Sequence, residues 1–289
     1  MNTNKIIKSL TIIACIIILC TVIVKLTVPN ETLLDYANEN PELAYATPEK
    51  EETEVTVSGN YENSTSENNV IAADEFYYTE LTDEIKTRIT GISYPITKNE
   101  ASSLNRTPIN VVEDSSDIQI TYDNLRYLHL LYYDFHGEVQ EGEIICNSYI
   151  AEDLKEIFYE LYCNSYPIES VRLIDDYNGD DEASMEANNC SCFNYRVIDG
   201  TTRLSNHALG CAIDINPFYN PYIVFNRNED GQDYITPKGS EIYADRSNDF
   251  EHKIDENDLC YQLFKEHGFS WGGNWESSKD YQHFEKLNE

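Results

Sequence analysis

Two short segments near the carboxyl end carry residues whose types and spacing could do chemistry. In the first, His207 is followed by Asp214, and in the second, Asp280 is followed by His283. Catalytic zinc sites use three protein ligands drawn from His, Asp and Glu, and they keep a fourth position open for water. His207, Asp214 and His283 therefore predict a zinc site. A tight turn before His283 would place the carboxylate of Asp280 beside the zinc-bound water.

The residues between the first histidine and Asp214 are small or apolar, as in a turn that enters a buried strand. Gly210 in this stretch would allow a close approach of backbone. A single His or Asp is more often structural than a ligand, but here ligand types, glycine and a second carboxylate occur together. Four histidines lack such neighbours and are interpreted as structural: His129, His136, His252 and His267.

The elements that must position these segments indicate an α+β domain. A β-prone stretch over residues 125–133 ends in a turn, and residues 143–149 could form the returning strand of a hairpin. Apolar residues at helical spacing predict an amphipathic helix over 150–161. A second helix is predicted from Asp258, with Gly268 placed to end it. The remainder of the carboxyl end indicates turns and short strands.

The overall charge argues against a nucleic-acid partner. The chain has 52 Asp and Glu against 20 Lys and Arg, for a formal net charge of -32. Such a surface repels a phosphate backbone. Residues 31–84 are acidic and poor in periodic apolar positions, a composition that cannot offset the entropy of ordering. They predict a flexible stalk before a catalytic domain at 85–289.

Residues 1–30 predict a membrane anchor. Lys5 and Lys8 precede an apolar run over residues 10–28, and a spanning helix needs about 20 apolar residues. The run reaches that length if Lys25 snorkels to the far interface. Positive charge before the run and acid after it orient the rest of the chain outward. A cleaved signal peptide and a lipoprotein attachment at Cys15 are the alternatives to this single-pass anchor.

The cysteines and an acidic loop leave further alternatives. Six cysteines lie outside the apolar run, where they could form up to three disulfides or remain buried thiols. Cys190 and Cys192 are separated by one residue, which is tighter than in the usual zinc–thiolate sites. Asp176, Asn178 and Asp180 resemble the start of a calcium loop, but its required Gly and final Glu are missing. We expect this loop to face solvent or border the cleft.

At these residues the chain resembles the zinc D-alanyl-D-alanine carboxypeptidases and dipeptidases of bacterial cell walls. That family includes VanY-like enzymes and related phage endolysin L-alanyl-D-glutamate endopeptidases. Its signature is Ser-x-His, a stretch with Gly and Ala, then Asp, and far downstream an acid shortly before a His-Phe pair. The matching residues here are Ser205, His207, Gly210, Ala212, Asp214, Asp280 and His283. The resemblance covers about residues 120–289 and implies a small α+β fold with a central antiparallel sheet flanked by helices.

The resemblance also implies roles for individual residues. Asp280 would be the catalytic acid or base, and Arg196 would stabilise the oxyanion, with Arg203 as the alternative. Ser205 would bind substrate or hold His207, and Trp271 and Trp275 would line the cleft. The zinc ligands would be His207, Asp214 and His283.

The resemblance and the predicted anchor together indicate a substrate class. A monomeric zinc peptidase held outside the membrane would face the cell wall, where peptidoglycan stem peptides are found. Removal of the terminal D-Ala, the D,D-carboxypeptidase reaction, is the first expectation. Peptidoglycan endopeptidase and L,D-carboxypeptidase activity are alternatives, because bond choice depends on cleft shape. An alternative of another class is a non-catalytic, zinc-containing module that binds the cell wall.

Overall fold

The computed structural model describes residues 73–198, 200–227 and 231–288. The predicted anchor over residues 10–28 and most of the predicted stalk lie outside these ranges. Within them, no helix combines the length and apolar character that crossing a bilayer requires.

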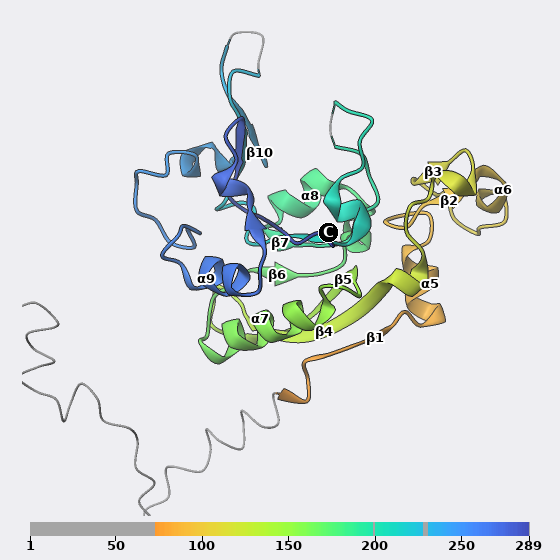
Figure 1. Ribbon diagram of the computed structural model, residues 1–289, viewed down its shortest axis with the longest axis horizontal. Coiled ribbons are helices and arrows are strands. Elements are labelled where there is room, and N and C mark those ends of the chain that lie inside the picture. The colour runs from red at the N-terminus through yellow and green to blue at the C-terminus, as the bar shows by residue number, and fades with distance from the viewer. Residues whose placement is uncertain (1–72, 199, 228–230, 289) are drawn as a thin grey trace, which may run out of the picture. The chain divides into compact units, whose positions relative to one another are not determined.

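A long hairpin covered by one helix forms the most regular part of the fold. Strands β4 (Leu125–Tyr133) and β5 (Val139–Asn147) pair antiparallel along their full lengths. Helix α7 (Ala151–Cys163) lies along β4 (Figure 1) and buries its apolar face, made of Leu154, Ile157, Phe158 and Leu161. These elements confirm the predicted hairpin and the first predicted helix. The β-prone residues with their turn, and the helical spacing of apolar residues, predicted them from the sequence.

The folded region begins earlier than the predicted domain boundary at residue 85. Strand β1 (Tyr77–Glu80) pairs antiparallel with β4, so the three strands have the order β1-β4-β5. Phe76, just before β1, is buried and packs edge-on against Tyr159 of α7. Helix α5 (Asp83–Ile89) follows, and the side chain of Thr82 caps it by accepting from Ile85 N. The acidic composition concealed this short edge strand.

The other described elements are short. Between α5 and β4 lie β2 (Ile96–Thr97), α6 (Lys98–Ala101) and β3 (Val111–Val112), and after α7 come β6 (Ser170–Val171), α8 (Asp181–Glu186) and β7 (Asn189–Cys190). Strand β2 pairs with β3, and β6 pairs with β7, both in parallel. Most of this part of the chain is therefore turns and single helical turns.

Two further three-stranded antiparallel sheets follow at the carboxyl end. One has the order β11-β13-β8 and the other the order β10-β9-β12. Their members are β8 (Ala212–Asp214), β9 (Tyr222–Val224), β10 (Tyr234–Thr236), β11 (Ser270–Trp271), β12 (Ser278–Asp280) and β13 (His283–Glu285). Helix α9 (Leu259–Glu266) confirms the second predicted helix, and Asp258 caps it.

The fold is therefore mixed, with antiparallel sheets and few helices, as the sequence predicts. The strands of the described residues are divided among separate small sheets, in place of one central sheet. Strand β8 is short because Asn216 adopts a left-handed conformation with φ 44° and Pro217 follows it. Proline has no N–H to donate to a ladder.

The thiols of the described region are free. Cys163 is exposed, and the other described cysteines are buried: Cys146, Cys190, Cys192, Cys211 and Cys260. Burial raises the pKa of the Cys190 thiol to about 12. Of the alternatives that the sequence left open, the structure shows free thiols, five of which are buried.

Candidate metal site

The first segment is held by a single 3-10 turn, η4 (Asn206–Leu209), which carries His207. The hydroxyl of Ser205 caps this turn by accepting from His207 N at 3.3 Å. Gly210 ends it with φ +66°, and a Cβ there would lie 2.7 Å from the backbone nitrogen of Asn147 at the end of β5. That nitrogen donates to Gly210 O at 2.8 Å. The close backbone approach predicted at this glycine is confirmed.

The second segment meets the first through strand register. In the β8–β13 pair, His283 lies opposite Asp214. Residues directly opposite in an antiparallel pair have Cβ atoms about 4.5–5.5 Å apart. Residues far apart in the sequence are therefore adjacent, and η4 immediately precedes β8. The backbone N–H of Asp214 also donates to Ser191 O at 3.0 Å, which fixes the other side of the strand.

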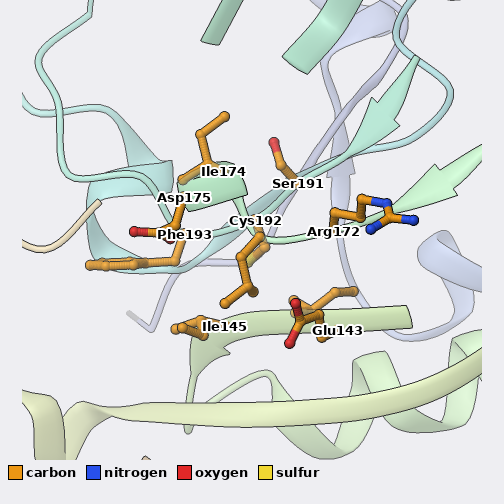
Figure 2. Close-up of a pocket in the computed structure, with 10 residues that line it drawn as sticks. Glu143, Ile145, Arg172, Ile174, Asp175, Ser191, Cys192 and Phe193 are labelled. Atoms are coloured by element: carbon orange, nitrogen blue, oxygen red, sulfur yellow. The ribbon is translucent and has the colours of Figure 1, made fainter. Parts of the chain in front are cut away.

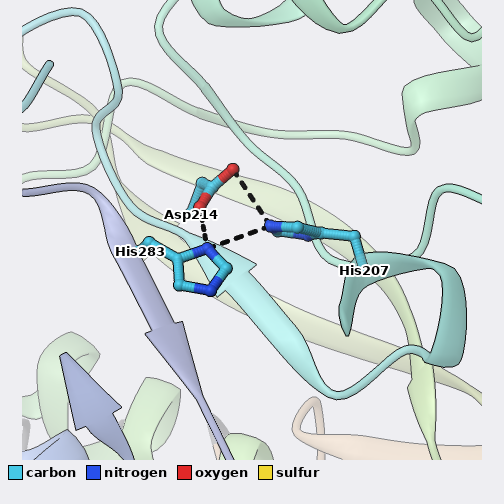
Figure 3. Close-up of side chains that lie close together, drawn as sticks. All are labelled: His207, Asp214 and His283. Carbon is cyan, nitrogen blue, oxygen red and sulfur yellow. Dashed lines mark hydrogen bonds and ion pairs between the residues drawn. The ribbon is translucent and has the colours of Figure 1, made fainter. Parts of the chain in front are cut away.

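Three side chains converge at this point, as Figure 3 shows. His283 Nδ1 lies 3.1 Å from Asp214 Oδ1, and His207 Nε2 lies 3.3 Å from Asp214 Oδ2. The two ring nitrogens are 3.2 Å apart. All three residues are buried, and their ligand atoms lie within 4.8 Å of one another. Two imidazole nitrogens and one carboxylate oxygen form a donor set that suits zinc.

The histidine nitrogens that point away from this centre have hydrogen-bond partners. His207 Nδ1 lies 2.7 Å from Cys192 O, and His283 Nε2 lies 3.0 Å from Glu285 Oε2. A proton on each outer nitrogen leaves the inner nitrogens, Nε2 of His207 and Nδ1 of His283, as lone-pair donors. This pattern of outer hydrogen bonds is typical of histidines that bind metal. The residues present therefore fit a zinc ion.

The charges of the cluster depend strongly on one another. Burial raises the pKa of Asp214, but the two histidines outweigh it and hold that pKa well below its usual range. Burial lowers the pKa of His283, but hydrogen bonds with Asp214 and Glu285 outweigh it and raise the pKa to about 10. Without a metal, the protonated ring of His283 is therefore the positive charge between the carboxylates of Asp214 and Glu285.

Asp280 ends β12, and its carboxyl interacts electrostatically with two of the ligands, His283 and Asp214. Its Oδ1 is buried and has no hydrogen-bond partner in the structure. Burial raises the pKa of this carboxyl to about 7, while the charge of His283 lowers it. The backbone of Gly272 packs so tightly here that a Cβ would lie 2.6 Å from Asp280 O and 3.3 Å from the Cβ of His283. The 3-10 turn η6 (Gly272–Asn274) thus fixes the acid relative to the ligand.

Of the two candidate arginines, the geometry favours Arg196. Its guanidinium binds Asp181 with an Nη2–Oδ2 distance of 2.7 Å, and its Nε is buried without a partner. Its positive charge is close enough to lower the pKa of Asp280. Arg203 is exposed on the neighbouring turn. A donor that is desolvated but unused is the more suitable one to meet an incoming carbonyl oxygen.

The two tryptophans have different surroundings. Trp271, which the sequence placed along the cleft, is 5% exposed and belongs to the hydrophobic core. Its indole N–H donates to Tyr281 O at 2.9 Å. Trp275 is half-buried, and its ring centroid lies 5.2 Å from that of His283. Of the two tryptophans predicted along the cleft, Trp275 is the one whose ring lies beside a ligand.

The acidic loop and a neighbouring pocket lie outside this cluster. Asp176 binds Arg88 at 2.6 Å, and Asp180 caps α8 by accepting from Ala183 N, so these acids have structural partners. A small pocket lies between β5 and the segments 172–175 and 191–193 (Figure 2). The residues that line it include none of the predicted site residues. It adjoins the site through Cys192, whose carbonyl holds His207.

The sequence did not reveal the residues that support the cluster. Glu285 was missed, although position i+2 on a strand shares a face with position i, so its nearness to His283 could have been inferred. Asp181 lies fifteen residues before Arg196 and gave no such signal.

Comparison with known proteins agrees with the motifs. Residues 199–286 match the model of a family described as D-alanyl-D-alanine carboxypeptidase. This range contains the three clustered residues and Asp280, and it begins after Arg196. A search of curated proteins and a search of solved structures gave no match. The match over residues 199–286 supports the predicted resemblance to the VanY-like D-alanyl-D-alanine carboxypeptidases.

Proposed function

We propose that this protein is a zinc-dependent D,D-carboxypeptidase that removes the terminal D-Ala from peptidoglycan stem peptides. One observation carries the proposal: His207, Asp214 and His283 converge beside a buried Asp280 oxygen that has no partner. The family match supports a peptidase for substrates of the D-Ala-D-Ala type. A site that only held a structural metal would have no use for the unpartnered acid.

The three clustered residues would hold zinc through His207 Nε2, one Asp214 oxygen and His283 Nδ1. When bound, zinc would lower the pKa of a coordinated water from 15.7 to roughly 7, which supplies a nucleophile near neutral pH. The outer bonds from Cys192 O and Glu285 would keep both rings in the required tautomers.

Asp280 would act as the general base and then as the general acid. It would accept the proton of the water that attacks the peptide carbonyl and deliver that proton to the leaving amine of D-Ala. A carboxyl with a pKa of about 7 suits both steps near neutral pH. Arg196, held by Asp181, would donate from its guanidinium to the developing oxyanion, where one donor is typically worth about 2.7–4 kcal/mol.

The setting of the domain is also proposed. The apolar run over residues 10–28 would anchor the chain in the cell membrane, with the monomeric domain outside, facing the cell wall. The acidic stalk would separate the two. We further propose that residues 85–289, with β1 added at the start, form one small peptidase domain of the family's fold. Its partner would be the stem peptide, and no nucleic acid.

The test uses the full chain, purified with detergent and analysed for metal. It is incubated with a muropeptide that carries a pentapeptide stem, and mass spectrometry follows the products. We expect loss of one alanine, and we expect a chelator and the His207→Ala variant each to abolish that loss. The Asp249→Asn variant changes an exposed acid and serves as the control.

Other outcomes would point elsewhere. Cleavage within the stem or a cross-bridge would keep the chemistry and change the bond. One bound zinc per chain with an intact stem peptide would contradict the proposal and favour a binding module.

A further inference from the structure

We propose that Glu285 is a positioning residue for the metal site, which makes this inference dependent on the proposed function. Its carboxylate, anchored by Asn206, would hold the His283 ring so that Nδ1 faces Asp214 and His207. Asn206 would act with it as the second member of the positioning pair.

The contacts of Glu285 are specific and largely enclosed. Its Oε2 lies 3.0 Å from His283 Nε2 and accepts from Asn206 Nδ2 at 2.6 Å. The side chain is 19% exposed. Its backbone is paired on both sides, with Ala212 of β8 and Ser270 of β11. Because β13 is the middle strand of its sheet, the carboxylate has little freedom to leave the histidine.

One carboxylate oxygen therefore links the two ligand-bearing segments. Asn206 immediately precedes His207 in η4, and its own carbonyl accepts from Cys211 N at 3.0 Å. The Glu285–Asn206 bond thus ties the η4 turn to β13, which carries the other histidine. Movement of either segment would strain this bond, so the bond helps to fix the separation of the two ligand nitrogens.

The bond also fixes where the proton of the ring lies. A carboxylate can only accept at Nε2, so the Nε2 atom of His283 carries a hydrogen and Nδ1 keeps its lone pair for the metal. Negative charge at this position increases the basicity of the ring and strengthens it as a ligand. A glutamine here could still accept from Nε2–H, but without the charge. An alanine would provide neither the accepting oxygen nor the negative charge.

The full chain with its zinc removed provides the test. Zinc affinity is measured by competition with a chromophoric chelator for the parent chain and for Glu285→Ala, Glu285→Gln and Asn206→Ala. The control is Glu266→Ala, which removes the same charge from an exposed position at the end of α9. We expect Glu285→Ala to weaken zinc binding by about 10–100-fold, Glu285→Gln by about 10-fold, and the control to leave binding unchanged.

A second readout separates positioning from a general structural role. In ¹⁵N-histidine-labelled, zinc-loaded protein, the Nε2–H signal of His283 should persist in Glu285→Gln and be lost or shifted in Glu285→Ala. If zinc binds the parent chain and both Glu285 variants with equal affinity, the inference is overturned while the proposed function stands. If the parent chain binds no zinc, both this inference and the proposed zinc-dependent function are wrong. Should the alanine variant fail to fold, an unchanged affinity in Glu285→Gln alone would overturn the inference.

Discussion

The hairpin layer of β4, β5 and α7 and the region of the metal site are built on different principles. In the hairpin layer two long strands pair along their full lengths, and one helix buries a continuous apolar face on them. The site region has strands of two or three residues. Its buried centre consists of two histidines and an aspartate.

Unsatisfied polar groups sharpen this contrast. Four buried side-chain atoms of the described residues have no partner, and all four lie from residue 188 onward: Asn188 Nδ2, Arg196 Nε, Asp280 Oδ1 and Gln282 Oε1. Each such group costs about 1–3 kcal/mol. Two of the four atoms, on Arg196 and Asp280, belong to residues with proposed catalytic roles, where a bound substrate or water would supply the missing partner. The apolar core is nevertheless shared, because Ile213 of β8 and Phe284 of β13 belong to the same buried cluster as Phe158 of α7.

The largest effect is expected from removing the acid in the site region. Asp280→Asn cannot accept the proton of the attacking water, so kcat/KM should fall by about 10²–10⁴-fold. Zinc content should stay at the parent level because Asp280 is outside the donor set. The measurement is the rate of D-Ala release, together with metal analysis. Equal loss of zinc in Asp280→Asn and His207→Ala would contradict this division of roles.

In the hairpin layer, the expected large effect is on stability. Phe158 in α7 is 1% exposed, and Phe158→Ala should lower the free energy of unfolding by about 3–5 kcal/mol. Zinc affinity of the folded fraction should not change. Urea unfolding followed by circular dichroism measures the free energy of unfolding, and chelator competition measures the zinc affinity. Glu160→Ala, on the exposed face of the same helix, is the control and should change stability by less than about 0.5 kcal/mol.

Sequence patterns were informative where one local rule governs the outcome. A β-prone stretch with a turn predicted the hairpin, helical spacing predicted α7 and α9, and ligand chemistry selected the three residues that converge. The acidic composition around β1 hid an edge strand, because composition averages over a longer stretch than four residues. The boundary was therefore placed too late.

Contacts between distant segments could not be predicted in this way. The motif from Trp271 to Trp275 does not say which ring enters the core, since that depends on the tight packing of Gly272 against Asp280. The partner of Arg196, Asp181, lies on a separate short helix. Such choices are made by tertiary packing, for which one sequence holds no local signal.

Gly210 tests whether the two regions are independent. It adopts φ +66°, and a Cβ would lie 2.7 Å from Asn147 N at the end of β5. Gly210→Ala should lower the free energy of unfolding by about 2–4 kcal/mol, from the left-handed conformation and the displaced backbone together. Because η4 carries His207, zinc affinity should fall as well.

The matched control for this variant is Gly137→Ala in the hairpin turn. Gly137 has φ +76°, and nothing lies within 4 Å of an added Cβ. Its cost should be limited to the conformational part, about 1–2 kcal/mol, with unchanged zinc affinity. If Gly210→Ala also left zinc affinity unchanged, the site would not depend on its contact with β5, and the two regions would be independent.

The smallest effect concerns a carboxyl at the junction of the two regions. Asp258 caps α9 by accepting from Cys260 N at 2.9 Å, and it accepts from the hydroxyl of Tyr166, which follows α7, at 3.0 Å. Burial raises the pKa of Asp258 from 3.8 to about 6, although the hydrogen bond from Tyr166 lowers it. Between these pH values the folded state binds a proton that the unfolded state has released. The stabilisation from this group is therefore complete below pH 3.8 and is lost as pH rises through about 6.

Asp258→Asn keeps a helix cap and cannot ionise. The parent chain should lose about 1–2 kcal/mol relative to this variant between pH 4 and pH 6, less than the full pKa shift would give because solvent partly screens the carboxyl. Urea unfolding at pH 4, 5, 6 and 7 measures the difference, and Asp249→Asn, at an exposed position, should run parallel to the parent chain. A difference that stays constant across this range would mean that Asp258 titrates normally. Burial at this junction would then not disfavour the ionised carboxyl of Asp258.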